Sequence, residues 1–586
     1  MKTYAYMWRL IRYRSLRYAS VTILWVLVCV APVIPGLLIQ QFFNELAKSG
    51  TLTPEIWGLI ALFMATAVVK AILIMWSGIL SNRLRFLITG LLRHNMLARV
   101  LELPGAQAIS GSAGEAITRF REDVEQVDHA VDWTIDLIGL SLFALIALVI
   151  LLRISIIVTF SIFLPLIAVV ALVQAMRKRL EKYRSASRKA TGAVTSFLGE
   201  IFGSVQAIQI AGAEERVTTR FHVLNEKRRA AMLKDRVLEQ LLNSTFSNIV
   251  GLGTGFILLL VAQSMRSLQL GVGDLAIFLY YLAFVTDFTH FFGTFLAHYT
   301  QTGVAFRRML HMLRGAPASS LVTHRPLYLS EKLPETSTSL KTSSQHFELL
   351  EATGLTYHYP STGRGIEDMD LRVRRGTVTV VTGQVASGKT TLLRVVLGLL
   401  PKEAGVVLWN GEIVSDPAEF FVPPRSAYTA QVPRLFSDTL KENILFGVPE
   451  DERALATALH TAVLEYDIAQ LEQGMETTIG VRGVKLSGGQ AQRVAAARMF
   501  IRGAELLVFD DLSSALDVET ESQLWERLFA HHRDITCLVV SHRRAVLQRA
   551  DRILLLKEGR LEATGTAEQL LRTSEEFRHL WSSEAV

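Results

Sequence analysis

Cysteine and charged side chains are both scarce in this sequence. Its 586 residues include two cysteines, Cys29 in a long apolar run and Cys537 in a short one. Such a pair excludes a disulfide framework, which fits a soluble part in the cytoplasm. Charged residues make up 20% of the chain against 50% hydrophobic residues, and the mean hydropathy is positive. These values indicate a membrane protein with a soluble part, and the length indicates several domains.

Features of nucleic-acid binding and of secretion are also missing. The net charge is +7, but the chain has no lysine-rich tail and no repeat of basic and aromatic residues. Basic residues that flank membrane spans explain this charge better, so we expect no nucleic-acid partner. The first apolar run, 21–38, is too long for the core of a signal peptide, and no small-residue cleavage site follows it. Basic residues precede this run, which predicts a cytoplasmic N-terminus, and Pro32 and Pro35 are expected to kink its helix.

Long apolar runs dominate the first half of the chain. Each is close to the roughly 20 residues that a helix needs to cross the hydrocarbon core. The six runs are 21–38, 56–80, 134–152, 156–176, 244–266 and 275–299. An even number of spans returns the chain to the cytoplasm, and the basic, helix-patterned segments 81–131 and 177–243 are expected to extend the spans on that side. The sequence thus predicts an all-α membrane domain over 1–315, in a multi-pass protein of the cell membrane that is surrounded by lipid.

Some ionisable residues lie inside the predicted spans. Lys70 belongs to the second span, and Asp287 and His290 lie one turn apart in the sixth. Because an uncompensated charge at membrane depth is costly, each is a candidate for a role in transport. A structural pair, or a position beside a water-filled cavity, would explain the same residues. The sequence does not decide between these explanations.

The helical pattern stops between 316 and 346, where prolines alternate with serines, threonines and charged residues. This composition is typical of an exposed linker, so we expect a second domain over 347–586. Short apolar strands alternate with helices in that domain, which indicates an α/β fold.

The stretch 383–390, with the sequence G-Q-V-A-S-G-K-T, organises the second domain. It follows an apolar strand at 378–381 and precedes a helix that begins near 391, which is the context that a P-loop needs. Gly383 and Gly388 allow the backbone to bend, so that its N–H groups face phosphate oxygens at a helix N-terminus.

Polar side chains of this loop and of two later strands complete a phosphate site. Lys389 can reach the β- and γ-phosphates, and the Thr390 hydroxyl can ligate Mg²⁺. Two further apolar strands end in polar groups, the first in Asp510 and Asp511 and the second, after Ser541, in His542. Because the carboxyl ends of parallel strands converge on the ligand crevice, we expect these groups to lie at the phosphates.

A second glycine motif, L-S-G-G-Q at 486–490, opens a predicted helix over 491–500. Ser487 and the two glycines can form another phosphate cradle at a helix N-terminus. The motif lies far from the P-loop in sequence, so nothing in the chain forces both into one site.

In its motifs and their order, the chain resembles an ATP-binding cassette (ABC) exporter half-transporter over nearly its whole length. The matching motifs are Walker A (383–390), the signature (486–490), Walker B (507–510) and the terminal histidine. The resemblance implies a six-helix membrane domain of exporter type and a C-terminal α/β P-loop ATPase cassette. It also implies a second half-transporter as partner, because two cassettes of this family pair head to tail, each signature closing over the other P-loop. Homodimer and heterodimer both remain open.

The resemblance implies ATP and Mg²⁺ as ligands. Tyr359 matches the aromatic residue that stacks on adenine, a contact worth roughly 1–3 kcal/mol. A partly exposed tyrosine at a strand edge, without a nucleotide contact, would give the same sequence pattern. Asp511 and His542 match catalytic positions. The implied Mg²⁺ ligands are Thr390, Gln431 and Asp510. The implied nucleotide contacts are Tyr359, Gly383, Gln384, Val385, Ala386, Ser387, Gly388, Lys389, Thr390, Thr391, Gln431, Ser487, Gly488, Gly489 and Gln490.

Three further segments resemble family elements. The residues 514–517 match the loop that crosses the cassette dimer interface, and 114–128 and 212–214 match the intracellular segments that rest on the cassettes. Two positions depart from the pattern. Asp511 stands where most members have glutamate, and Val481 stands where exporters often have glutamate. The first change shortens the expected base by one methylene, which predicts slow hydrolysis. Gln431, His542 and the signature are intact, so we expect that hydrolysis to be real.

The sequence therefore predicts ATP-driven export of an amphipathic or hydrophobic substrate by alternating access between two arrangements of the bundle. One alternative is a regulatory, weakly hydrolysing subunit of a heterodimeric transporter. Another is an ATP-gated channel, although no long regulatory insertion supports it. The identity of the substrate does not follow from the sequence.

Overall fold

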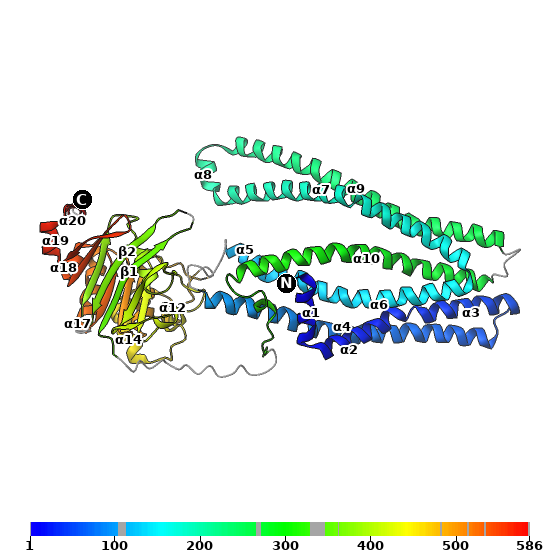
Figure 1. The fold of residues 1–586 in the computed structure, drawn as a ribbon, viewed down its shortest axis with the longest axis horizontal. Helices are drawn as coiled ribbons and strands as arrows, with labels where there is room; N and C mark the ends of the chain where they lie inside the picture. Colours follow the sequence, from blue (N-terminus) through cyan, green and yellow to red (C-terminus); the bar gives the residue numbers. More distant parts are fainter. Residues whose placement is uncertain are drawn as a thin grey trace. The chain divides into compact units, whose positions relative to one another are not determined.

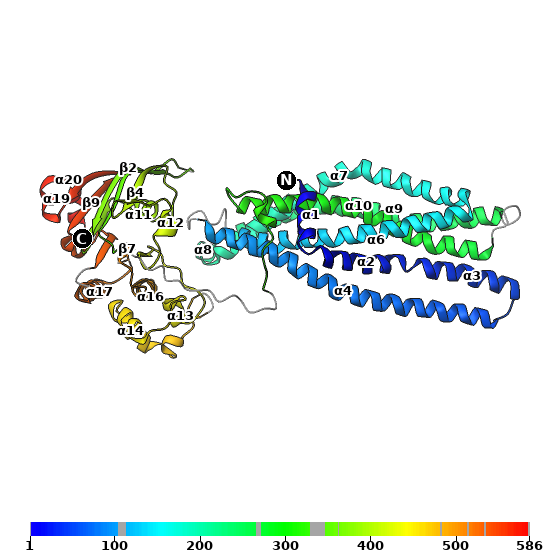
Figure 2. The same ribbon diagram turned by 60° about the horizontal axis from the view of Figure 1, so that its bottom comes forward.

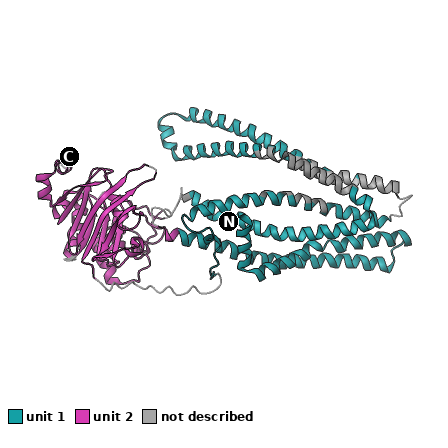
Figure 3. Ribbon diagram, in the orientation of Figure 1, with its two compact units in different colours: residues 1–99, 111–329 teal, residues 100–110, 330–586 magenta. Residues whose placement is uncertain are grey.

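The structure is a computed structural model that describes residues 2–103, 113–264, 271–328, 346–360, 362–480, 483–512, 515–531 and 535–583. The chain divides into two compact units, 1–99 with 111–329 and 100–110 with 330–586 (Figure 3). We call the first the membrane unit and the second the cassette unit, and each is described by itself.

The membrane unit is built from helices, several of them long (Figure 1). They are α1 (Thr3–Tyr13), α2 (Ser15–Val30), α3 (Val33–Ser49), α4 (Pro54–Glu102), α5 (Ala113–Thr118), the π-helical turn Arg119–Asp123, α6 (Val124–Ile154), α7 (Ile156–Gly203), α8 (Val205–Ile210), α9 (Glu214–Ser264) and α10 (Val272–Met312). α2 and α10 both pack against α6, and α7 lies beside α9 (Figure 2).

Helices run through all the predicted spans over the described residues. In that part of the chain, three segments are long and apolar enough to cross a membrane, namely Ser15–Ser49, Pro54–Glu102 and Gly114–Ile154. α7, α9 and α10 run through the remaining predicted spans. The first helix is interrupted between Val30 and Val33, as expected at Pro32, whereas α3 runs through Pro35 without a break, so the kink expected there is absent. α4, α7 and α9 also continue well beyond the length of a span, as the basic segments predict.

An ion-pair network links α4 and α6 inside the membrane unit. Arg85 donates from Nε to Asp128 Oδ2 over 2.7 Å and lies 3.4 Å from Asp132, which also accepts a 3.1 Å hydrogen bond from Ser81. These contacts compensate the charge of the buried Asp128. Of the candidates in the spans, Lys70 is half-buried and Asp287 is exposed, whereas the His290 side chain lies outside the described residues.

The chain beyond α10 packs back onto the same unit. The 3₁₀ turn Ser320–Val322 places Leu321 and Val322 in the core, where they are 0% and 2% exposed. Asn95 of α4 donates from Nδ2 to the carbonyl oxygens of Leu321 and Thr323, over 3.0 and 2.9 Å. The first part of the expected linker therefore contacts the membrane unit, and 329–345 lie outside the described residues.

The cassette unit contains two sheets. The four-stranded sheet has the order β2-β1-β4-β5 and is antiparallel, and the six-stranded sheet has the order β10-β9-β3-β8-β7-β6 and is parallel except for β10. The strands are β1 (Leu349–His358), β2 (Gly365–Arg374), β3 (Val378–Gly383), β4 (Ala404–Trp409), β5 (Glu412–Ile413), β6 (Ser426–Thr429), β7 (Leu506–Asp510), β8 (Thr536–Val540), β9 (Arg552–Lys557) and β10 (Arg560–Gly565).

Helices cover these sheets and two apolar cores lie between the layers. The helices are α11 (Lys389–Val396), α12 (Pro417–Phe420), α13 (Leu440–Leu445), α14 (Glu452–Thr461), α15 (Glu465–Gln470), α16 (Gly488–Phe500), α17 (Val518–His531), α18 (Arg544–Arg549), α19 (Ala567–Thr573) and α20 (Glu575–Ser583). The α/β fold predicted for this half is confirmed.

The register of the parallel strands positions the candidate site. Every residue of β3, β7 and β8 is buried, as expected for strands covered on both faces. Val540 pairs with Val381 on one side and with Asp510 on the other. The three strands therefore end at the same level, and the polar residues that follow them share one edge of the sheet.

Candidate nucleotide site

The loop between β3 and α11 has the backbone of a phosphate cradle. Gly383 and Gly388 have φ of 143° and 101°, and a Cβ on Gly383 would overlap the carbonyl oxygen of Leu556. Both positions therefore require glycine. Lys389 donates from Nζ to the carbonyl oxygens of Gly383 and Gln384, over 2.8 and 2.7 Å, so the loop wraps around its ammonium group.

A hydroxyl and a carboxylate meet beside this loop. Thr390 donates from Oγ1 to Asp510 Oδ1 over 2.7 Å, and Tyr428 donates to the other carboxylate oxygen over 3.1 Å. Asp510 is fully buried, and burial raises its pKa although both hydrogen bonds oppose the shift. Burial and the charge of Asp510 raise the pKa of Tyr428 to about 12, so the phenol stays a donor at neutral pH.

Asp511 stands at the same edge in an unusual backbone conformation. Its φ is 55°, in the left-handed region that aspartate tolerates better than most residues, and its N–H donates to the Val540 carbonyl over 3.1 Å. Gln431 donates from Nε2 to Asp511 Oδ2 over 3.2 Å. The candidate base and the candidate metal-contacting amide are therefore in direct contact.

Lys389 and His542 are electrostatically coupled to these carboxylates. Burial lowers the pKa of Lys389, although the charges of Asp511 and Asp510 oppose the shift. Burial and the charge of Lys389 lower the pKa of His542, which lies 3.5 Å from the Thr382 hydroxyl. The imidazole is therefore neutral at pH 7. The convergence of strand ends that the sequence predicts is present in the fold.

Other predicted nucleotide contacts surround the loop. Tyr359 follows β1, is half-buried, and places its hydroxyl 3.4 Å from that of Thr391. Gln384 donates to Glu576 of α20 over 2.5 Å. Val385 is exposed and Ser387 is buried, and Ala386 has a positive φ of 67° between them.

The signature motif forms the N-terminus of α16. Ser487 is the N-cap, with its Oγ accepting from the N–H of Gln490 over 3.2 Å, and Gln490 Oε1 accepts from the N–H of Ser487 over 2.9 Å. A Cβ on Gly489 would come 2.8 Å from the carbonyl oxygen of Ala515, so glycine permits the close approach of that loop. Gly488, like Ser487, is exposed. Val481 and Ser514 lie outside the described residues.

Two family models match separate regions of this chain. The model of the ABC transporter family matches residues 366–514, and the model of the ABC transporter transmembrane region matches residues 19–287. The two matches place a cassette and a membrane region in one polypeptide. The chain belongs to the ABC transporter family. ABC transporters bind and hydrolyse ATP and are integral membrane proteins, and this transporter carries both parts that these properties require.

Curated relatives match the ABC transporter along most of its length. An ATP-dependent lipid A-core flippase of Xanthomonas oryzae pv. oryzae (strain MAFF 311018) is 28% identical over 499 residues, covering 83% of this chain and 81% of the relative. The corresponding flippase of Albidiferax ferrireducens is 27% identical over 542 residues, covering 89% and 87%. That of Chromohalobacter salexigens is 29% identical over 488 residues, covering 82% and 80%.

A solved structure shows the same fold. A bacterial Atm1-family ABC exporter with ATP bound superposes with a TM-score of 0.78 at 20% sequence identity, covering 98% of this chain and 99% of the other. The exporter type of the fold, predicted from the order of the motifs, is confirmed.

Sequence reasoning missed two polar residues of this ABC transporter site. Tyr428 reaches Asp510 because β6 pairs with β7, with Tyr428 opposite Val508. Gln492, which is 2% exposed, donates from Nε2 to the Gln431 carbonyl over 3.3 Å and accepts at Oε1 from the N–H of Ala515 over 3.2 Å. The position of Gln492, two residues after the signature, could have indicated its role. A polar side chain on a buried face of α16 needs hydrogen-bond partners.

Proposed function

We propose that this ABC transporter exports an amphipathic, lipid-like substrate across the cell membrane by alternating access, as a dimer of half-transporters. The observation that carries the proposal is the contact of Thr390 with Asp510 beside the P-loop, in one chain with an apolar helical bundle. The lipid substrate is supported by the names of the relatives, each of which is a lipid A-core flippase. The basic residues before α2 support a cytoplasmic N-terminus, and six spans would return the chain to the same side at the cassette.

The site also fits Mg²⁺. The Thr390 hydroxyl and the Asp510 carboxylate supply two oxygen donors 2.7 Å apart, and Mg²⁺ prefers oxygen ligands. Within the described ranges, no group of three or more histidine, cysteine, aspartate or glutamate residues could hold a metal by itself. This agrees with an ion whose remaining ligands are phosphate oxygens. The ion would neutralise the negative charge of those oxygens. We assign Thr390, Gln431 and Asp510 to this ion.

The remaining polar groups suit hydrolysis of the γ-phosphate. Lys389 contributes a positive charge at the β- and γ-phosphates. Asp511 accepts a hydrogen bond from Gln431, which directs its carboxylate to one side of the loop. From that position it would take the proton of the attacking water. His542 stands at the same edge and can donate one hydrogen bond from its ring to phosphate.

Flipping of a labelled lipid tests this proposal. The purified chain is reconstituted in liposomes that contain a phospholipid or lipid A with a nitrobenzoxadiazole label, and dithionite bleaches the label in the outer leaflet. Export by outward-facing cassettes would move lipid to the inner leaflet, so we expect ATP, but not ADP, to increase the protected fraction. Equal protection with both nucleotides would refute a lipid substrate.

A regulatory, weakly hydrolysing subunit is the second candidate, and Asp511 in place of glutamate favours it. The oligomeric state and ATPase rate of the chain purified alone in lipid distinguish the two. A homodimer that hydrolyses ATP is a complete exporter. A monomer, or a dimer that binds ATP without turnover, indicates a missing partner subunit.

Replacing Tyr359 with alanine is expected to raise the KM for ATP roughly tenfold, because a stacked base contributes about 1–3 kcal/mol. We expect kcat to change little, since stacking on adenine contributes to binding of the nucleotide and not to the reaction at the γ-phosphate. Tyr359→Phe keeps the ring and loses only the 3.4 Å contact with Thr391, so it should retain the wild-type KM. ATPase kinetics of the three proteins provide the test. An unchanged KM in the alanine variant would identify Tyr359 as a strand-edge residue without a role in binding.

A further inference from the structure

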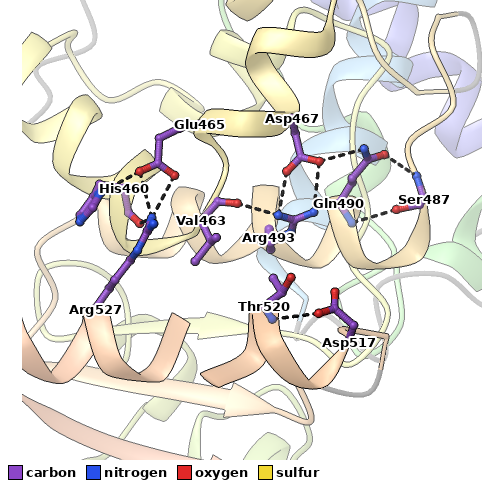
Figure 4. Close-up of polar contacts among 10 residues, drawn as sticks. All are labelled: His460, Val463, Glu465, Asp467, Ser487, Gln490, Arg493, Asp517, Thr520 and Arg527. Carbon is purple, nitrogen blue, oxygen red and sulfur yellow. Dashed lines mark hydrogen bonds and ion pairs between the residues drawn. The ribbon is translucent and has the colours of Figure 1, made fainter. Parts of the chain in front are cut away.

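Asp467 of the short helix α15 contacts the signature helix α16 (Figure 4). Its Oδ1 accepts from Gln490 Nε2 over 3.0 Å and from Arg493 over 3.1 Å, and its Oδ2 lies 2.8 Å from the same guanidinium. Arg493 also donates to the Val463 carbonyl over 2.6 Å. The Asp467 and Arg493 side chains are only 13% and 14% exposed, so water screens this ion pair weakly.

The contact determines the orientation of the Gln490 amide. An ionised carboxylate only accepts hydrogen bonds, so Asp467 requires the NH₂ end of that amide. The oxygen end then faces the N–H of Ser487, which completes the reciprocal capping of α16. Asp467 is thereby linked to Ser487 through the Gln490 side chain, without touching it. Ser487 and Gly488 are exposed, so this end of the helix is accessible to a partner.

The same short helix also holds α17. Glu465 accepts from Arg527 at both carboxylate oxygens, over 2.9 and 3.0 Å, and lies 2.7 Å from His460 Nδ1 (Figure 4). α17 begins next to Asp517, which accepts from the N–H of Thr520 over 2.9 Å. α15 therefore connects the two helices that begin at the signature and at the 515–517 loop.

We propose that Asp467 is a positioning residue for the ATP held by the partner cassette. By fixing Gln490 and Arg493, it keeps Ser487 and the N-terminus of α16 in the geometry that binds the γ-phosphate across the dimer. This inference rests on the dimer of the proposed function, with its cassettes paired head to tail as the family resemblance implies. ADP has no γ-phosphate, so the signature contributes to binding of ATP and not of ADP.

Equilibrium binding of ATPγS and of ADP to the full chain in lipid nanodiscs tests the proposal. For Asp467→Asn, which keeps the shape and removes the charge, we expect roughly tenfold weaker binding of ATPγS, with ADP affinity within about twofold of wild type. Asp467→Glu keeps the charge and should restore most of the affinity. Glu472→Gln makes the same charge change at an exposed position five residues away and should leave both affinities unchanged.

The outcomes separate the possible roles. Unchanged ATPγS affinity in Asp467→Asn would refute the proposal. An equal loss of affinity for both nucleotides would show a general defect of the cassette and refute it as well. Wild-type protein that prefers ATPγS to ADP but flips no lipid would refute the proposed substrate and leave the role of Asp467 standing. Wild-type protein without this preference would refute the role of Asp467.

Discussion

Replacing Lys389 with alanine is expected to lower the ATPase rate at least about a hundredfold, the usual cost of losing a group that stabilises transition-state charge. The ammonium is held by the carbonyl oxygens of Gly383 and Gln384, in the centre of the loop. No other ammonium group is held by the carbonyl oxygens of this loop among the described residues, and Lys557 at the end of β9 contacts Glu576 instead. Steady-state phosphate release from protein in liposomes measures the rate.

Lys402→Ala is the matched control for this variant. Lys402 belongs to the same unit and its replacement makes the same charge change, in the connection between α11 and β4. We expect Lys402→Ala to keep the wild-type rate. A Lys389→Ala protein with more than half of the wild-type rate would show that the loop does not bind the hydrolysed nucleotide.

The second large effect concerns Asp511. Asp511→Asn is expected to reduce hydrolysis by about a hundredfold or more, since general base catalysis contributes roughly 10²–10⁴. Asn tolerates the positive φ of 55° at this position, so the fold should persist. Asp511→Glu extends the carboxylate by one methylene toward the attacking water, and we expect about a tenfold faster rate, because small errors of placement are costly.

Single-turnover hydrolysis under saturating ATP separates this chemistry from nucleotide binding. Glu412→Gln, at an exposed position of β5, makes the same charge change as Asp511→Asn and should leave the rate unchanged. Equal rates in wild type, Asp511→Asn and Asp511→Glu would remove Asp511 from the mechanism. A faster Asp511→Glu variant would show that aspartate, in place of the usual glutamate, slows ATP hydrolysis in this transporter.

The parts of the site that could be predicted are those encoded locally. The buried strands β3, β7 and β8 are short apolar runs that end in polar residues, and a parallel sheet brings such ends together. The six apolar runs and the basic segments between them likewise predicted the helices of the membrane unit. Asp511 stands out only through the family resemblance, because most members have glutamate at that position.

The parts that could not be predicted depend on contacts between distant segments. Asp467 meets Arg493 26 residues later and Tyr428 meets Asp510 82 residues later, and no local pattern encodes either pair. No sequence pattern predicts the left-handed backbone of Asp511 either, because aspartate occurs in many backbone conformations. Inside the membrane unit, the partners of Asp128 and Asp132 depend on how α4 packs against α6.

The packing of Leu321 and Val322 bears on how cassettes can be exchanged between transporters. A graft that begins at residue 316 would replace both side chains in the core in which they are 0% and 2% exposed, and the donor segment would have to present its own backbone carbonyls to Asn95. Joining the donor sequence beyond residue 328 leaves these contacts with the recipient. Recombination between relatives, in the laboratory or in evolution, is therefore least disruptive when residues 313–328 are inherited together with the helical bundle.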